Sequence, residues 1–308
     1  MNSKILFAIL TWDHLTQLKL CIASIKPYLD NQKNFDLLVI DNGSADKTPE
    51  WLSQNYLKSQ VVRLPKNMGV AAGYNHALRF AIKQGYDYVV LVDDDVLIHA
   101  LPLQKIVDFM NADPKIGLII PKIYADYQNR KLWSMGGKLV IQLAQPFHHG
   151  LSHIDKGQYQ NPVSVDYSPK PWMLGIKTVE KIGFFDESYG LYGFEDLDYC
   201  VKIKKAGYAI MAEPAFICEQ NPLSSITRNN PGYDYWMTRN RLLFAKQLIP
   251  LLPFCLFFLP YFIMRRVIVP SLAFLFTFRI KRIWFLFRGI KWHFLNPDEQ
   301  RKLDSLIS

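Results

Sequence analysis

The segment Tyr88-Val89-Val90-Leu91-Val92-Asp93-Asp94-Asp95 joins a short apolar run to three consecutive carboxylates. A valine-rich run of this length, bounded by polar residues, predicts a buried strand. Adjacent carboxylates repel one another unless a cation or hydrogen-bond donors compensate their charge. A hard divalent ion prefers carboxylate oxygens, and ligands of open α/β sheets bind at the carboxyl ends of strands. The segment therefore predicts a metal site at the rim of a sheet, with a solvated acidic loop as the alternative.

Apolar runs and helical patterns alternate on both sides of this segment. Strands are expected at residues 5–10, 37–40, 61–62 and 117–120, and helices at residues 15–25 and 70–84. Strands that alternate with helices predict an α/β fold with a mostly parallel, doubly wound sheet. Residues 124–170 show no clear period, and a long irregular insertion of this kind is often a substrate-binding surface. A further helix is expected up to about Lys205, before Gly207.

Composition and charge restrict the class of protein. The chain has 308 residues, half of them hydrophobic, which suffices for one large domain or two. Its four cysteines form no CxxC pair, which favours free thiols over disulfides or a zinc site. Residues 231–308 hold 12 Lys/Arg against 4 Asp/Glu and account for nearly all of the net charge of +9. The N-terminal part is therefore close to neutral, and no nucleic-acid partner is expected.

The C-terminal quarter has the composition of a membrane-associating region. Residues 248–264 and 267–278 contain no charge and are separated by Arg265 and Arg266. The first stretch contains three prolines and is shorter than the roughly 20 residues of a spanning helix. Apolar segments flanked by Lys, Arg and Trp suit the interface of an anionic membrane. We expect shallow or re-entrant insertion here, with an ordinary pair of core helices as the alternative.

Several motifs accompany the aspartates in a fixed order. They are Leu10-Thr11-Trp12, residues 39–48 (VIDNGSADKT), residues 67–75 (NMGVAAGYN), residues 183–187 (GFFDE), Glu195-Asp196-Leu197-Asp198 and Thr238-Arg239-Asn240. This set resembles family 2 glycosyltransferases of the GT-A fold, nearest to bacterial rhamnosyl- and galactofuranosyltransferases, over residues 1–246. The resemblance implies an inverting transfer of a sugar from a UDP- or dTDP-sugar to a cell-surface or lipid-linked glycan. It places the enzyme at the cytoplasmic face of a membrane, bound peripherally or by shallow insertion.

The resemblance also assigns residues to the nucleotide-sugar. Asp41 would accept a hydrogen bond from the N3–H of uracil or thymine, and Thr11 and Trp12 would help to form the base pocket. A loop that enters a helix would let the nucleotide approach the backbone, through Asn67, Gly69 and Asn75. The alternative for these three residues is turn and capping chemistry, for which Asn and Gly are usual choices.

In the aspartate cluster, the D-x-D pattern of the family falls on Asp93 and Asp95. Asp93 would face the ribose and share a Mn²⁺ or Mg²⁺ ion with Asp95, whereas Asp94 points to the other side of an extended segment and would contribute less. Many relatives have a histidine as a third metal ligand, several residues after the proline that ends the following strand. Residues 214–220 contain no histidine, so Glu219 or Gln220 would supply an oxygen instead.

Inversion by direct displacement needs a base that takes the proton of the acceptor hydroxyl. The resemblance assigns this role to Asp196, with Glu195 beside it in the site. Asp198 is expected to have a structural role. The alternative is a helix start, where acidic residues interact favourably with the helix dipole. Acceptor contacts are expected from Trp133, Met135 and Trp172.

These assignments divide the chain into a catalytic domain, residues 1–230, and a C-terminal helical region, residues 231–308. The nucleotide-sugar half of the catalytic domain spans residues 1–122 and the acceptor half residues 123–230. A phosphohydrolase is an alternative function, but it needs its aspartates after the first strand. A nucleotidyltransferase needs an early glycine-rich basic loop, which is not visible. A non-catalytic adaptor with a degenerate fold is the third alternative.

Overall fold

The computed structural model describes residues 3–30, 34–220 and 232–307. The chain forms two compact units, each built from separate segments. The first consists of Met1–Lys138, His148–Glu187 and Asp196–Pro222, and the second of Leu139–Phe147, Ser188–Glu195 and Leu223–Ser308.

One mixed sheet forms the centre of the first unit. Among the described residues its order is β10-β12-β6-β11-β4-β1-β2-β3, with β5 paired to β12 and β7 to β6. The strands are β1 (Ile5–Thr11), β2 (Phe35–Asp41), β3 (Val61–Arg63), β4 (Tyr88–Asp93), β5 (Val96–Ala100), β6 (Ile116–Asp126), β7 (Lys131–Ser134), β10 (Val163–Val165), β11 (Trp172–Gly175) and β12 (Ala209–Gln220). Strands β4, β1, β2 and β3 are parallel, as predicted, and so are β6 and β12. Strand β11 runs antiparallel between β4 and β6, which the alternating pattern does not predict.

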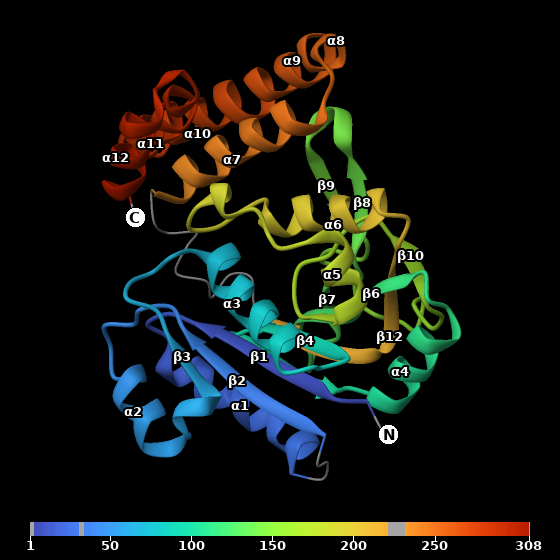
Figure 1. Cartoon of the computed structure of the whole chain (residues 1–308). Coiled ribbons are helices and arrows are strands. Elements are labelled where there is room, and N and C mark those ends of the chain that lie inside the picture. The colour runs from blue at the N-terminus through green and yellow to red at the C-terminus, as the bar shows by residue number, and fades with distance from the viewer. Residues whose placement is uncertain (1–2, 31–33, 221–231, 308) are drawn as a thin grey trace. The chain divides into compact units, whose positions relative to one another are not determined.

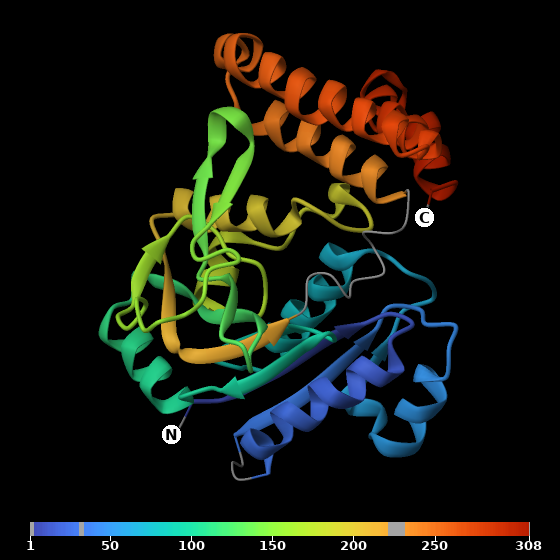
Figure 2. The ribbon, with the colours of Figure 1, turned by 180° about the vertical axis from the view of Figure 1, so that it is seen from behind.

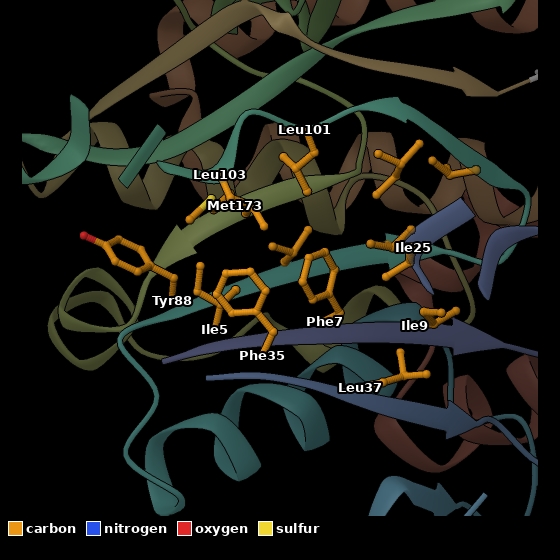
Figure 3. Close-up of a cluster of buried hydrophobic side chains, with 14 of the residues drawn as sticks. Ile5, Phe7, Ile9, Ile25, Phe35, Leu37, Tyr88, Leu101, Leu103 and Met173 are labelled. Carbon is orange, nitrogen blue, oxygen red and sulfur yellow. The ribbon is translucent and has the colours of Figure 1, made fainter. Parts of the chain in front are cut away.

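Helices cover both faces of the parallel strands (Figure 1). The helices of this unit are α1 (Leu15–Leu29), α2 (Thr48–Asn55), α3 (Val70–Lys83), α4 (Leu103–Ala112), α5 (Ile176–Ile182) and α6 (Glu195–Lys205), whose first residue belongs to the second unit. Because side chains alternate along a strand, Phe7 and Ile9 of β1 pack in one core with Ile25 of α1 (Figure 3). Leu10 faces α3 instead, where a Cβ on Gly73 would lie 2.3 Å from its Cδ1 atom. Glycine at this position lets α3 lie close to β1.

The segment expected to be irregular, residues 124–170, is more regular than its composition suggests. It contains β7 and β10, and also a separate two-stranded sheet of β8 (Gly137–Val140) and β9 (Gln145–His148). These strands have three or four residues each, too short to produce a readable hydrophobic period.

The second unit is helical. It contains α7 (Gly232–Leu248), α11 (Ile280–Lys291), α12 (Pro297–Ser305) and a continuous helix, Leu251–Phe276, beside α7 (Figure 2). The continuous helix consists of α8 (Leu251–Pro253), α9 (Leu259–Phe262) and α10 (Val269–Phe276) joined by the π-helical segments Phe254–Phe258 and Ile263–Ile268.

The prolines of this segment do not end the helix. Each π-helical segment lies just before a proline, Pro260 or Pro270. A wider turn accommodates a proline ring and its missing N–H without ending the helix. The helix has 26 residues and a mean hydropathy of 1.7, so its length and composition would allow it to cross a membrane.

Candidate active site

The carboxyl ends of β1, β2 and β4 lie side by side. In the parallel register, Thr11 pairs with Asp41, and Leu10 pairs with Asp93. Three of the predicted site residues, Thr11, Asp41 and Asp93, are therefore the last residues of neighbouring strands. This rim of the sheet is where α/β folds bind their ligands.

The three consecutive aspartates point to three different donors. The Asp93 Oδ1 atom accepts a hydrogen bond of 2.5 Å from the Tyr74 hydroxyl. Asp94 is buried and accepts from Thr11 Oγ1 at 2.6 Å, with His14 Nδ1 at 3.2 Å. Asp95 Oδ1 accepts from Gln220 Nε2 at 2.8 Å. The divergence follows from the backbone, because Asp93 ends β4 whereas Asp94 and Asp95 form the turn before β5.

The cluster holds more negative charge than its neighbours compensate. Burial, followed by the charge of Asp93, raises the pKa of Asp95 to about 7, although Gln220 lowers it. The hydrogen bond to Asp94 raises the pKa of His14, so this histidine favours its cationic form. A carboxyl that holds its proton near neutral pH indicates a site that a further cation would stabilise.

Thr11 and Trp12 differ in what they can offer a ligand. The Thr11 side chain is buried and its hydroxyl is bound to Asp94. The hydroxyl of Thr11 is therefore already engaged by Asp94, and its predicted part in the base pocket stays a prediction. Trp12 is 46% exposed and free to contact a base.

Asp41 is a fully buried carboxylate with an unused acceptor. Its Oδ1 atom accepts from Ser44 N at 2.8 Å. Its Oδ2 atom forms an ion pair of 3.5 Å with Arg63 Nε and accepts no hydrogen bond from the described residues. Buried acceptors without a donor are costly, so an N–H group of a ligand is a suitable partner for this atom.

The amide side chains of Asn67 and Asn75, both predicted to lie near the nucleotide, form hydrogen bonds within the protein. Asn67 Oδ1 accepts from Asn42 Nδ2 at 3.0 Å and from Gly69 N at 2.9 Å. Asn75 Nδ2 donates to Phe185 O at 3.0 Å and to Glu187 Oε1 at 2.8 Å, and its Oδ1 accepts from Phe185 N. Gly69 has a φ of +90°, which L side chains rarely adopt, and precedes α3. The alternative of turn chemistry therefore describes this loop better than ligand contact does.

Glu195 and Asp196 are the first two residues of α6. Asp196 is partly exposed, and burial of its carboxyl raises its pKa. The charge of Lys170 lowers this pKa and that of Asp93 raises it, so Asp196 lies within the field of the aspartate cluster. A carboxylate with a raised proton affinity is a better base than an ordinary one. Asp198 forms an ion pair of 3.0 Å with Lys202, consistent with its predicted structural role.

The side chain of Glu219, the predicted oxygen donor to the metal, is engaged by His99 and Tyr127. Its Oε2 atom lies 2.9 Å from His99 Nε2, and its Oε1 atom accepts from Tyr127 N at 3.2 Å. Neighbouring side chains of a strand face opposite ways, and Gln220 is the residue that reaches Asp95.

The possible metal ligands at the rim are the carboxylate oxygens of Asp93 and Asp95, which fit Mg²⁺ or Mn²⁺. Within residues 3–30, 34–220 and 232–307, no group of three or more His, Cys, Asp and Glu side chains is arranged to hold a metal ion. The carboxylates of Asp93 and Asp95 would therefore need oxygens from outside this group, such as those of a diphosphate or water.

Two of the three predicted acceptor contacts are core residues. Met135 and Trp172 have no exposed surface, and the Trp172 indole N–H donates to the carbonyls of Ser168 and Pro169. Trp133 is half-buried and its ring packs against His148 at 4.6 Å. Only Trp133 of the three stays a candidate for contact with an acceptor.

The structure adds three residues that the sequence reasoning did not place in the site, His14, Tyr74 and Lys170. Gln220, predicted as the alternative to Glu219, is the donor to Asp95. Tyr74 lies within the segment 67–75, so its motif was visible although its role was not. Lys170 follows no motif, and only the packing of the chain reveals it.

Comparison with known proteins gives consistent similarities. A family model described as Glycosyl transferase family 2 matches residues 8–183. The chain is 22% identical to dTDP-rhamnosyl transferase RfbF of Shigella flexneri over 276 residues, 82% of this chain and 83% of that protein. It is 27% identical to the uncharacterized protein y4gI of Sinorhizobium fredii over 210 residues, 64% of this chain but 22% of that protein. The chain thus spans less than a quarter of this last relative.

Two solved structures share the fold. Mannosyltransferase PcManGT from Pyrobaculum calidifontis, in complex with GDP-Man and Mn²⁺, superimposes with a TM-score of 0.55 at 18% identity, over 94% of this chain and 74% of that one. GalNAc-T7 with UDP, GalNAc and Mn²⁺ superimposes with a TM-score of 0.56 at 13% identity, over 79% and 48%. These similarities confirm the fold class predicted from the sequence.

Proposed function

The chain belongs to glycosyl transferase family 2 and is a glycosyltransferase with a nucleotide-sugar donor. From this premise we propose that it transfers a sugar from a UDP- or dTDP-sugar with inversion of the anomeric configuration. The acceptor is a lipid-linked or cell-surface glycan. The observation that carries the proposal is the meeting of Asp41, Asp93 and Asp95 at one sheet rim, within the electrostatic field of Asp196.

The unused Oδ2 atom of Asp41 supports recognition of the base. A carboxylate accepts hydrogen bonds and cannot donate them when ionised. Uracil and thymine both present an N3–H donor, which complements this acceptor, whereas the N3 atom of cytosine has no hydrogen. Trp12 is exposed and offers a ring against which the base stacks.

The rim carboxylates support binding of the diphosphate with a metal ion. Asp93 and Asp95 are the residues that would hold Mg²⁺ or Mn²⁺. The ion, when bound, neutralises charge on the departing nucleoside diphosphate. The high pKa of Asp95 supports this assignment, because a cation is the natural partner for a carboxylate in a like-charged cluster.

Asp196 supports the displacement step as its base. The acceptor O–H bond breaks and its proton goes to the Asp196 carboxylate, while the acceptor oxygen bonds to the anomeric carbon. The bond from that carbon to the phosphate oxygen breaks, and its electron pair leaves with the nucleoside diphosphate. One displacement of this kind inverts the anomeric configuration.

The second unit supports attachment to an anionic membrane. The helix Leu251–Phe276 exposes large apolar side chains along its length, among them Leu252, Phe257, Leu272 and Phe276. Its other face is used inside the unit, where Phe258 and Phe262 are buried and Tyr261 donates to Gln145 Oε1 at 2.9 Å.

We favour a helix that lies in the interface. Arg265 is exposed near the middle of the helix, and an arginine at the centre of a bilayer costs roughly 2.5–3.5 kcal/mol or more. The described cysteines are all free thiols, which fits the reducing cytoplasmic side.

Turnover of nucleotide-sugars by the purified protein with Mn²⁺ tests the proposal. We expect slow release of nucleoside diphosphate from at least one UDP- or dTDP-sugar, and NMR of the released or transferred sugar should show the inverted anomer. Asp196→Asn is the matched control, which should bind the donor and turn it over far more slowly. Retention of configuration would refute the mechanism, and binding without turnover across a broad donor panel would support the adaptor instead.

A further inference from the structure

Lys170 is a nearly fully buried lysine in the loop before β11. Its side chain is 4% exposed. The Nζ atom lies 5.0 Å from the ring centroid of Trp172, 5.2 Å from that of Tyr74 and 5.9 Å from that of Phe185. Three aromatic rings around one ammonium favour its charged form, because each ring presents a negative face to the cation. The rings therefore offset part of the cost of burying the ammonium.

The aromatic box around Lys170 also includes the helix that carries Asp196. Tyr199 of α6 stacks on Phe185 with a centroid distance of 4.1 Å and on Trp172 at 6.1 Å. Residues three apart on a helix share a face, so Asp196 and Tyr199 point to the same side of α6. The face of α6 that packs on the box is thus the face that presents Asp196.

Charged and titratable groups from several elements act on Asp196. They are Lys170 from the loop before β11, Asp93 from β4, Tyr167 from the loop after β10 and Cys200 from α6 itself. Burial and Asp93 favour the protonated carboxyl, whereas Lys170 and the backbone N–H of Leu197 favour the carboxylate.

Tyr74 links the same box to the donor side of the site. It lies against Lys170 and donates to Asp93 through its hydroxyl. Lys170 therefore contacts a ring whose hydroxyl binds the aspartate cluster, and its charge also acts on Asp196.

We propose that Lys170 is a positioning residue of the transfer reaction, whose caged ammonium holds Asp196 as an oriented carboxylate ready to accept the acceptor proton. This inference rests on the proposed role of Asp196 as the base. The rings of Trp172 and Phe185 that lie around the ammonium also stack on Tyr199 of α6. The lysine itself neither gains nor loses a proton in the reaction.

The direct test measures the titration of Asp196 by ¹³C NMR of aspartate-labelled, metal-free protein, with the signal assigned by Asp196→Asn. Lys170→Met removes the charge at similar length, and Lys170→Gln serves as a second neutral variant if the first fails to fold. Lys177→Met, which removes an exposed lysine of α5, is the matched control. Removing an opposite charge close to a carboxylate should raise its titration midpoint by about one pH unit or more.

The expected result is a higher Asp196 midpoint in both neutral variants, with Lys170→Arg and Lys177→Met close to the wild type. An Asp196 midpoint that is the same with and without the Lys170 charge overturns the proposal. This readout does not require activity, so it decides on Lys170 even if the chain transfers no sugar.

Kinetics provide the second readout. In Lys170→Met, the acidic limb of the kcat profile should move to higher pH by the same interval, with the KM for the donor unchanged and Lys170→Arg restoring much of the rate. A loss of kcat that is equal at every pH would show that Lys170 only maintains the fold. Absence of transfer by the wild type would instead refute the proposed function and leave the NMR result standing.

Discussion

Asp95→Asn should make the protein more stable and less able to bind its ligand. The substitution keeps the shape of the side chain and removes one of three neighbouring charges. The pKa of Asp95 rises from its ordinary value of 3.8 to about 7, with burial as the main cause and the charge of Asp93 as the second. Such an acid binds its proton more tightly in the folded state than in the unfolded state, and this determines how stability changes with pH.

Below about pH 4 the carboxyl is protonated in both states and contributes no penalty. As the pH rises toward 7, the unfolded state loses this proton first, and the free energy of unfolding falls. Above pH 7 the folded state bears the full free-energy cost of ionising the buried Asp95 carboxyl. The interval between 3.8 and about 7 corresponds to about 4 kcal/mol, at about 1.4 kcal/mol per pKa unit. This is an upper limit, because Asp93 and Asp94 share the same field.

Urea unfolding of the metal-free protein at pH 5 and pH 8 measures the effect. We expect Asp95→Asn to exceed the wild type by between 1 and about 4 kcal/mol at pH 8, with a smaller gain at pH 5. Asp108→Asn, at an exposed position of α4, should change stability by less than about 0.5 kcal/mol. An Asp95→Asn protein that is equally stable or less stable at pH 8 would refute the claim that the neighbours of this cluster leave its charge uncompensated.

Three further predictions concern other parts of the molecule. Asp196→Asn should lower kcat by roughly 10²–10⁴-fold and leave donor affinity by calorimetry nearly unchanged; an unchanged kcat would remove Asp196 from the role of base. Asn75→Ala breaks three buried hydrogen bonds to residues 185–187 and should cost about 2–3 kcal/mol in urea unfolding, whereas Asn129→Ala, at an exposed turn, should cost less than about 1 kcal/mol; equal losses would contradict the anchoring role. Phe257→Glu with Phe276→Glu should weaken sedimentation with anionic vesicles, unlike Leu20→Glu at an exposed site of the first unit, and an unchanged bound fraction would argue against membrane contact by this helix.

The sequence predicts the parallel part of the sheet well because its strands are long enough to carry a pattern. Residues 88–92 and 5–10 are continuous apolar runs, and both are strands within a residue or two of the expected bounds. The short strands β8 and β10 and the antiparallel β11 were missed, since three or four residues carry no readable period. Strand order across the sheet depends on long-range pairing, about which local sequence patterns carry no information.

The sequence predicts the charged residues of the candidate site but not the residues that support them. Carboxylates such as Asp41 and Asp95 stand out in a sequence because burying them needs a reason. Asn75 looked like a ligand-binding residue, yet its amide is bound to a loop 110 residues away, which no local pattern reveals. Trp172 is expected to contact the acceptor but is a core residue, and no local pattern reveals its burial either. The side chains of Glu219 and Gln220 lie on opposite faces of β12. Which of them faces Asp95 depends on the strand register, which the sequence does not reveal.

The central claim is that aspartates at the sheet rim recruit a cation, which in turn holds the diphosphate of a nucleotide. Calorimetric titration of the wild-type protein with UDP and with dTDP, in Mn²⁺ and again in excess chelator, tests it most directly. The account predicts binding of at least one nucleotide with Mn²⁺ and a loss of at least about tenfold in affinity without it, equivalent to about 1.4 kcal/mol. Equal affinity in both conditions would contradict it.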